Sequence, residues 1–350
     1  MSVWVAVGTR PEAIKMAPVV AALRRRGVAV MLCTTGQHPA LCRDALAVMG
    51  LAPDRELAIA GSSTLPDRLA RVISAVGAAV AEAPPALVLV HGDTASAAGA
   101  ALAAHLVEVP VGHVEAGLRT GDRRAPFPEE SLRRLIDGLA ELCFAPTALA
   151  RDQLLAEGIA PERISVTGNP IVDAVASIAE PDRTPVAGRV LVTAHRRENV
   201  AALGPICDAV RALASGGASV VWPVHPNPAV EEVVRARLGG VSGVTLAPPL
   251  AYRAFVRAMQ EASLILTDSG GVQEEAACLG RPTLVLRDRT ERPEVLSTGV
   301  VALVGTDPAR IVARATEWLS TPPVPASGPF PLGDGRAGEH VAERVVRWLG

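Results

Sequence analysis

Short apolar runs alternate with longer amphipathic segments over most of the chain, a pattern typical of a parallel α/β sheet. In the first half the predicted strands are 3–7, 28–35, 86–91, 111–114, 142–144 and 164–166, and the predicted helices are 12–26, 39–49, 66–83, 95–106, 129–140 and 148–157. Because these strand runs are almost continuously apolar, we expect helices to cover both faces of the sheet.

A polar segment with two prolines, 180–188, interrupts this pattern and predicts a linker. A second alternation follows, with predicted strands 190–193, 219–223, 244–246, 264–267 and 283–286 and a last helix at 339–349. A chain of 350 residues also favours two domains. We therefore predict an α/β fold with two doubly wound, Rossmann-like domains facing each other across a cleft. The first is 1–179 joined by the C-terminal helix 339–350, and the second is 189–335.

The composition of the chain argues against some classes of binding partner. A formal net charge of −2 argues against a nucleic-acid or anionic-membrane surface, which needs a basic excess. Five scattered cysteines without a CxxC pair indicate buried thiols in a reducing compartment. The chain begins directly with a strand pattern, and no apolar run is long enough for a membrane span. We expect a cytoplasmic protein.

Polar clusters follow almost every predicted strand. They are GTRPE (8–12), TGQH (35–38), HGDT (91–94) and HVEAG (113–117) in the first domain, and AHRREN (194–199), PVHPNP (223–228) and DSGGVQEE (268–275) in the second. Open parallel sheets bind ligands beyond the carboxyl ends of their strands. We therefore expect both rows of clusters to line one site.

The segment DSGG at 268–271 precedes a predicted helix and suits a phosphate group. Small residues there leave backbone N–H groups exposed, and the helix dipole favours an anion. The alternative is simple N-capping by Asp268 or Ser269. An acid one turn further on, such as Glu275, can accept hydrogen bonds from ribose hydroxyls. The combination favours a nucleoside diphosphate.

Two cations lie in the first strand–helix connection. Arg10 is placed to neutralise a phosphate, and Lys15, the only lysine of the chain, lies about one turn further on. The GxxxxGK[ST] spacing of a P-loop is absent, and both residues could also be ordinary surface cations. The stretch GDGRAG at 333–338 fits GxGxxG but follows no strand, so it is interpreted as the start of the last helix.

Carboxylates at strand ends are the main chemical clue. Asp93 follows one apolar strand, Glu115 ends another, and Glu129 and Glu130 open a helix. Alternation along the strand predicts that His113 and Glu115 face the same side. Acids that converge on one site raise one another's pKa, which suits general acid–base catalysis near neutral pH. For Glu130 a capping role is the alternative.

These acids could also hold a divalent metal, but no HExxH, DxD or paired-histidine spacing is present, so no metal site is predicted. In the second domain His195 could contact a phosphate or move a proton, and His225 is a similar candidate. Both could instead be structural. No GxSxG or Cys–His signature occurs, which argues against an acyl-enzyme mechanism.

Nine sequence blocks together resemble the non-hydrolysing UDP-N-acetylglucosamine 2-epimerases. They are GTRPEAIKMAP, TGQH, VHGDT, VGHVEAGLRTGD, PFPEE, HRREN, PVHPNP, TDSGGVQEEA and RDRTERPE, in this order over about 300 residues. The resemblance implies a glycosyltransferase-B-like fold and UDP-GlcNAc as the substrate. UDP would leave by anti elimination to give 2-acetamidoglucal, and it would re-add after C2 is protonated from the opposite face, giving UDP-ManNAc. The resemblance implies no metal and no redox cofactor. It does imply a homodimer that forms through the first domain.

The resemblance also assigns residues. The acid–base candidates are Asp93, Glu115 and Glu129, and His195 would stabilise the leaving diphosphate or take part in proton transfer. The substrate-binding candidates are Arg10, Lys15, His225, Ser269, Gly270, Gly271, Glu275 and Arg292. A second, activating UDP-GlcNAc site is matched by Gln37, His38, Arg71 and Arg196, although Pro39 and Ala40 replace the polar residues expected next.

Other departures from the family pattern are Ser131-Leu132 before Arg133, where an Asn usually precedes the Arg, and Pro170 in place of Thr.

Three alternative functions remain open. They are a hydrolysing epimerase that releases ManNAc and UDP, a UDP-sugar glycosyltransferase, and a catalytically inactive nucleotide-sugar sensor. The sensor would be expected to lack one or more of the three acids.

Overall fold

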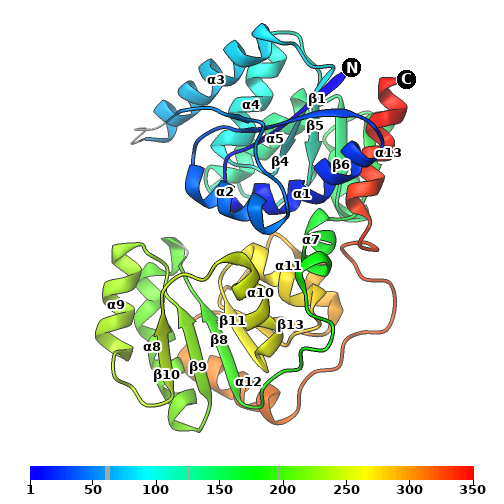
Figure 1. The fold of residues 1–350 in the computed structure, drawn as a ribbon. Helices are drawn as coiled ribbons and strands as arrows, with labels where there is room; N and C mark the ends of the chain where they lie inside the picture. Colours follow the sequence, from blue (N-terminus) through cyan, green and yellow to red (C-terminus); the bar gives the residue numbers. More distant parts are fainter. Residues whose placement is uncertain (60–63, 125, 196) are drawn as a thin grey trace. The chain divides into compact units, whose positions relative to one another are not determined.

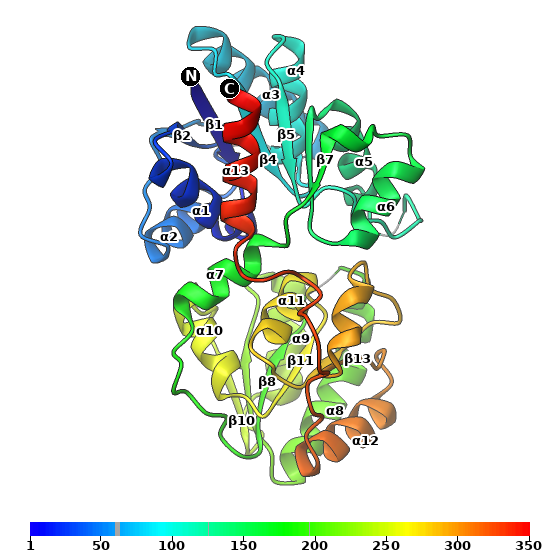
Figure 2. The same ribbon diagram turned by 90° about the vertical axis from the view of Figure 1, so that its right-hand side faces the viewer.

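The computed structural model describes residues 1–59, 64–124, 126–195 and 197–350. Its internal contacts divide the chain into two compact units (Figures 1 and 2). Unit 1 consists of residues 1–174 and 332–350, and unit 2 of residues 175–331. The described residues contain no helix that is both long and apolar enough to cross a membrane.

Unit 1 is built on a parallel sheet of seven strands in the order β3-β2-β1-β4-β5-β6-β7. The strands are β1 (Ser2–Val7), β2 (Ala29–Thr34), β3 (Arg55–Glu56), β4 (Leu87–His91), β5 (Val111–Val114), β6 (Leu142–Ala145) and β7 (Ile164–Val166). Six of these strands were predicted from their apolar runs. The two-residue edge strand β3 was not, because Arg55-Glu56 carries no apolar signal.

The helices of unit 1 are α1 (Arg10–Arg25), α2 (Pro39–Val48), α3 (Leu65–Glu82), α4 (Ala95–Leu106), α5 (Glu129–Leu139), α6 (Ala148–Ala156), α7 (Pro170–Ile178) and α13 (Ala337–Leu349), with a 3-10 turn at Pro161–Arg163. Helix α7, which was not predicted, continues across the boundary into unit 2. Figure 2 shows α13 lying beside α1, so the C-terminal residues complete unit 1.

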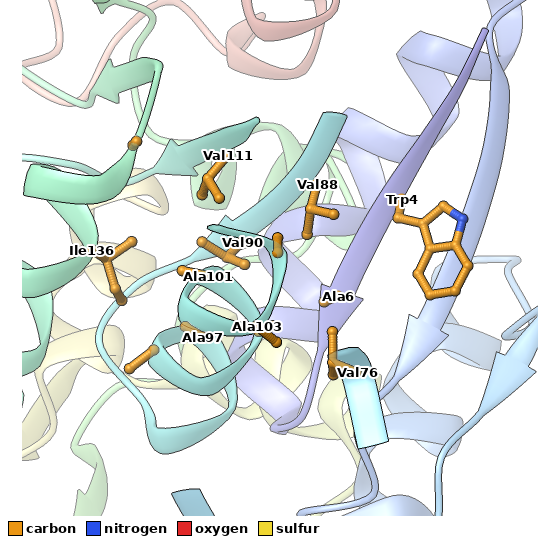
Figure 3. Close-up of a cluster of buried hydrophobic side chains, with 14 of the residues drawn as sticks. Trp4, Ala6, Val76, Val88, Val90, Ala97, Ala101, Ala103, Val111 and Ile136 are labelled. Atoms are coloured by element: carbon orange, nitrogen blue, oxygen red, sulfur yellow. The ribbon is translucent and has the colours of Figure 1, made fainter. Parts of the chain in front are cut away.

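Small residues let α4 pack closely in the core of unit 1. Figure 3 shows Ala97 and Ala101 of α4 near Val88 and Val90 of β4. A Cβ at Gly99 would lie 2.6 Å from a methyl carbon of Val72 on α3, so only glycine permits this approach. The tightly packed core fixes the sheet and thereby the loops at the carboxyl ends of its strands.

Unit 2 contains a parallel sheet of six strands in the order β10-β9-β8-β11-β12-β13. The strands are β8 (Arg189–Thr193), β9 (Ser219–Pro223), β10 (Val244–Ala247), β11 (Leu264–Thr267), β12 (Thr283–Val285) and β13 (Val301–Leu303). The helices are α8 (Leu203–Ser215), α9 (Pro228–Leu238), α10 (Tyr252–Glu261), α11 (Gly270–Cys278) and α12 (Pro308–Ser320), with 3-10 turns at Arg197–Ala202 and Pro293–Thr298. Strand β13 was not predicted.

Segment 180–188, predicted as a linker, is fastened to α10. The side chain of Gln260 donates to Glu180 O at 2.7 Å and accepts from Glu180 N at 3.1 Å. Val186 N donates to Glu261 O at 2.8 Å, and Arg183 also contacts the Glu261 carboxylate. The segment is therefore an ordered part of unit 2.

Candidate functional site

Glu115 lies immediately after β5, and its carboxylate is surrounded by donors from three other elements. Lys15 of α1 contacts its Oε2 atom, and His91 Nε2, at the end of β4, lies 3.1 Å from the same oxygen. Asn169, just before α7, donates to it at 3.3 Å. The Lys15 and Glu115 side chains are only 4% and 5% exposed, so the ion pair is buried. Together these groups fix the Glu115 carboxyl group at the edge of the sheet.

The backbone of Glu115 is strained. Its φ of 69° lies in the left-handed region, which costs a non-glycine residue about 1–3 kcal/mol. Glu115 lies beyond the end of β5, so the alternation of side chains along a strand does not set the direction of its side chain. The prediction that Glu115 and His113 face the same side therefore does not apply. The contacts differ: His113 bonds to Asp137 and to Gly92 O, whereas Glu115 meets Lys15 and His91.

A fourth carboxyl group, Glu12 in the first turn of α1, lies at the same sheet edge. One oxygen accepts from Gly8 N at 2.5 Å and Thr9 N at 2.9 Å, and the Thr94 hydroxyl donates to the other. Burial raises the pKa of Glu12, although these hydrogen bonds and nearby His91 oppose the increase. Glu12 belongs to the GTRPE motif, but it was not among the predicted acid–base residues.

Asp93 begins the connection after β4 and pairs with Arg133 of α5. Arg133 Nη2 lies 2.5 Å from Asp93 Oδ2, and Arg133 Nη1 lies 2.9 Å from Glu130 Oε2. The acids were expected to raise one another's pKa. In the structure Asp93 and Glu115 each have a cation against them, and at this sheet edge burial raises the pKa of Glu12.

Glu129 differs from its neighbour Glu130. Glu130 is fully buried and accepts from Thr120 N, Arg133 and Arg134. Glu129 is half-buried, and its buried Oε2 atom has no hydrogen-bond partner among the described residues. A buried acceptor without a partner needs an explanation, and a role toward a ligand or in a reaction is one.

In unit 2, the connections after β8 and β11 are joined through Asp268. This fully buried carboxylate accepts from His195 N at 3.1 and 3.0 Å and from Asn199 Nδ2 at 3.1 Å. Ser269 occupies the N-cap position of α11, but within the described part of the chain its side chain makes no capping bond. The alternative of simple side-chain capping by Ser269 is therefore not what the structure shows.

Arg292 lies over the first residue of α11. A Cβ at Gly270 would be 2.5 Å from Arg292 Nη1, which shows how closely the guanidinium approaches the helix terminus. Arg292 also donates to Glu274 at 2.6 Å and to Glu291 at 2.7 Å. These two carboxylates offset the charge of Arg292, so the N–H groups of the helix terminus are what suits this position to a phosphate. Glu275 is largely buried one turn further along α11.

The two candidate histidines of unit 2 stack on each other. The rings of His195 and His225 have centroids 4.9 Å apart and are inclined by 9°. Asn227 N donates to His225 Nδ1 at 3.1 Å, so this nitrogen acts as an acceptor. Both residues follow neighbouring strands, β8 and β9, which explains why the structure brings them together.

The remaining predicted residues are less connected. Arg10 is exposed at the first position of α1, and His38 is exposed before α2. Ser96 donates to the Gln37 side chain at 2.7 Å. Arg71 of α3 bonds to Asp67 at 2.9 and 3.0 Å. Arg196 lies outside the described residues.

The structure adds residues that sequence reasoning did not assign to the site: Glu12, His91, Arg133, Asn169 and Asp268 as the anchor of His195. All but Arg133 lie at or just after a strand end, and this position is the signal that could have found them; Arg133 lies within α5 and carries no such signal. In the described ranges no group of three or more His, Cys, Asp or Glu side chains has an arrangement able to hold a metal ion.

Comparison with known proteins gives a consistent result. The family described as UDP-N-acetylglucosamine 2-epimerase matches residues 21–346. The chain is 41% identical over 369 aligned positions to UDP-N-acetylglucosamine 2-epimerase of Escherichia coli K12, covering 99% of this chain and 98% of that protein. It also resembles the crystal structure of UDP-GlcNAc 2-epimerase from Neisseria meningitidis bound to UDP-GlcNAc, with a TM-score of 0.92, 36% identity, and coverage of 99% and 100%.

A more distant likeness concerns the fold alone. The glycotransferase of kitacinnamycin superposes with a TM-score of 0.58 at 14% identity, covering 98% of this chain and 93% of that one. Together with the epimerase structures, it confirms the predicted glycosyltransferase-B-like class with two parallel α/β sheets.

Proposed function

The chain belongs to the UDP-N-acetylglucosamine 2-epimerase family, and from this premise we propose that it reversibly converts UDP-GlcNAc to UDP-ManNAc by inverting C2. The observation that carries the proposal is that Glu115 pairs with buried Lys15 and Asp93 with buried Arg133 in unit 1, while Arg133 lies one turn after Glu129 on α5. Full-length likeness to a relative whose structure holds UDP-GlcNAc supports the choice of substrate.

The proposed reaction is an anti elimination followed by re-addition. A base removes the C2 proton while the bond between C1 and the diphosphate oxygen breaks, which leaves 2-acetamidoglucal and UDP. C2 is then protonated from the opposite face, and UDP adds again at C1. Inversion requires proton-transfer groups on both faces of one carbon. We assign this work to Asp93, Glu115 and Glu129.

The surroundings of these acids suit proton transfer. Lys15 and Arg133 are buried cations in direct contact with Glu115 and Asp93, and they hold the two carboxyl groups in place. Glu129 offers an oxygen that makes no hydrogen bond within the described residues. In this proposal Lys15 also contacts the substrate beside the acids.

We assign the UDP moiety mainly to unit 2. Backbone N–H groups of the first turn of α11 would bind phosphate oxygens, with Arg292 beside them. Glu275 would accept hydrogen bonds from the ribose. His195, oriented through its backbone by Asp268, would stabilise the departing diphosphate or take part in proton transfer. The proposed substrate-binding set is completed by Arg10, His225, Ser269, Gly270 and Gly271.

The decisive experiment is incubation of the protein with UDP-GlcNAc in deuterium oxide, followed by NMR. We expect UDP-ManNAc to form reversibly and deuterium to appear at C2 of both sugars. Absence of C2 exchange by the intact protein would overturn the proposal. Release of free ManNAc and UDP would identify a hydrolysing epimerase instead, and transfer of the sugar to an added acceptor would identify a glycosyltransferase.

We further propose a homodimer formed through unit 1. Light scattering after size-exclusion chromatography tests it, because the dimer has twice the 36.1 kDa mass of one chain.

The predicted activating site also stays a proposal. It would show as a dependence of the reverse reaction, from UDP-ManNAc, on added UDP-GlcNAc, and that dependence should weaken when Gln37 or Arg71 is replaced by alanine.

A further inference from the structure

His113, Asp137 and Arg119 form a buried hydrogen-bonded network in unit 1. None of the three has a role in the reaction proposed above. His113 Nδ1 lies 2.6 Å from Asp137 Oδ1, and Arg119 Nη2 lies 2.7 Å from Asp137 Oδ2. Arg119 also bonds to Glu157 at 2.6 and 2.9 Å. The side chains of His113, Asp137 and Arg119 are 0%, 2% and 3% exposed. Buried charges are costly, so this set invites a functional explanation.

The first connection runs from His113 to the turn that carries Asp93. His113 Nε2 donates to Gly92 O at 2.8 Å, and Gly92 N donates to Val114 O at 3.1 Å. Gly92 has a φ of 70° and directly precedes Asp93. Both polar backbone groups of this glycine are therefore held by β5, the strand to which His113 belongs.

Asp137 makes the matching connection to the turn that carries Glu115. Its Oδ2 atom accepts from Gly117 N at 3.3 Å, two residues after Glu115. Burial raises the pKa of Asp137, but His113 and Arg119 outweigh it and leave the pKa below its ordinary value. A carbonyl can only accept, so His113 Nε2 is the donor toward Gly92 O, and His113 Nδ1 shares a proton with Asp137 Oδ1. A residue with a strained backbone, such as Glu115, keeps its conformation only where the surrounding contacts hold it there, and the bond from Gly117 to Asp137 is one such contact.

The third connection is the helix itself. Asp137 lies on α5, which begins at Glu129 and carries Arg133 one turn before Asp137. Arg133 in turn binds the Asp93 carboxylate. A displacement of α5 relative to β5 would therefore move Glu129 directly and Asp93 through Arg133.

We propose that the His113–Asp137 pair is a positioning device that holds the turns of Asp93 and Glu115 and the start of α5 at one fixed spacing. The inference rests on the proposed function, in which these three acids act on one carbon. Acid–base catalysis tolerates little displacement, and a shift of about 1 Å can cost about 100-fold in rate. The pair would act on the rate through the acids, without touching the substrate.

Conservative variants of His113 separate the two halves of this device. His113→Asn keeps a donor near the Nδ1 position and loses the bond to Gly92, whereas His113→Gln keeps a donor near Nε2 and loses the bond to Asp137. We expect each to lower kcat about 10- to 100-fold. KM for UDP-GlcNAc should change less than about twofold, because most proposed UDP contacts lie in unit 2. Asp137→Asn should behave like His113→Gln.

The control is Val80→Ala, which removes buried side-chain atoms from α3 in the same core and touches neither turn. It should lower Tm and leave kcat unchanged. The proposal is wrong if kcat of the His113 variants stays at the wild-type value. It is also wrong if their loss of activity only follows their loss of Tm and Val80→Ala shows the same relation.

A second measurement does not depend on turnover. Amide hydrogen exchange of peptides covering 91–95 and 115–121 should become faster in His113→Asn and Asp137→Asn but not in Val80→Ala. Unchanged exchange in both segments would overturn the positioning role whatever the activity. Conversely, a wild-type protein that shows no C2 exchange refutes the proposed reaction, while the exchange data still decide whether the pair holds the two turns.

Discussion

At the scale of single residues, two neighbouring glutamates show how differently the structure uses the same side chain. Glu130 is fully buried and bonded to Thr120 N and two arginines, so it serves the local structure. Glu129 is half-buried, and its Oε2 atom lacks a hydrogen bond within the described ranges. Sequence reasoning chose Glu129 by resemblance, and burial gives a physical reason for the same choice.

Replacement of Glu129 should separate activity from stability. We expect Glu129→Gln to lower kcat about 10²- to 10⁴-fold, because a proton-transfer group is lost, while the free energy of unfolding stays the same or rises. The matched variant Glu130→Gln should instead cost about 1–3 kcal/mol of stability, since it disturbs a satisfied buried network. Kinetics and urea unfolding of both proteins test this, and a stability loss in Glu129→Gln would contradict it.

Glu12 should make stability depend on pH. Its folded-state pKa is raised above the ordinary value of 4.5, so the folded protein binds this proton more tightly than the unfolded chain does. The stability that Glu12 contributes is complete below the ordinary value and is lost as pH rises through the folded-state pKa.

Glu12→Gln cannot titrate, so its free energy of unfolding relative to wild type should increase across that window. Urea unfolding of both proteins between about pH 4 and pH 7 measures the difference. A difference that does not vary with pH would show that burial of Glu12 has no such consequence.

Among the helices and strands, the start of α11 is the position where local geometry matters most. A Cβ at Gly270 would lie 2.5 Å from Arg292 Nη1 and 3.1 Å from Glu291 Oε1, so any larger residue there would have to displace the Arg292 side chain. At Gly271 the same atom would meet nothing within 4 Å among the described residues. Two adjacent glycines therefore carry different constraints, which the sequence motif alone does not distinguish.

Gly270→Ala should displace Arg292 and weaken UDP binding about tenfold, equivalent to about 1.4 kcal/mol. Gly271→Ala adds the same methyl group without displacing Arg292, and the loss should be smaller. Calorimetric titration with UDP measures both affinities. Equal losses in the two variants would show that Arg292 is not the reason for the effect.

Helix α13 depends on a comparable close approach to α1. A Cβ at Gly338 would lie 2.7 Å from the backbone oxygen of Pro18, so Gly338→Ala should cost about 1–3 kcal/mol of stability. Gly138→Ala is the control, because a Cβ there meets no described atom within 4 Å and alanine favours a helix by about 0.5–1 kcal/mol. Urea unfolding should show changes of opposite sign, and a neutral Gly338→Ala would contradict the packing argument.

On the scale of the whole molecule, the two units differ in how the chain builds them. Unit 2 is one continuous segment, 175–331, with its own buried core around Trp222 and Leu264. Unit 1 needs α13 from the far end of the chain. The cleft predicted between the domains stays a prediction.

A fragment of residues 175–331 should therefore fold alone and bind UDP. A dispersed NMR spectrum and shifts of the α11 amide signals on addition of UDP would be the expected result. Residues 1–174 without α13 provide the comparison and should be markedly less stable than the full chain, because the face of α1 that packs on α13 is uncovered. A disordered 175–331 fragment would contradict this view of the fold.

Most of the fold was predictable because strand and helix patterns are local. The parts that were missed, β3, β13 and α7, are short or lie where one unit passes into the next. An edge strand of two or three residues is defined by its pairing with a neighbour, and such pairing leaves little signal in its own sequence.

The sequence by itself determined the fold class, the family and the identity of the three candidate acids, since motifs and apolar periodicity are written in neighbouring residues. Only the tertiary structure decided the state of each acid. Lys15 meets Glu115 across 100 positions, Arg133 meets Asp93 across 40, and Thr94, just before α4, reaches Glu12 across 82. Burial and ion pairing depend on residues brought together by the fold, and so does the charge each carboxyl group carries.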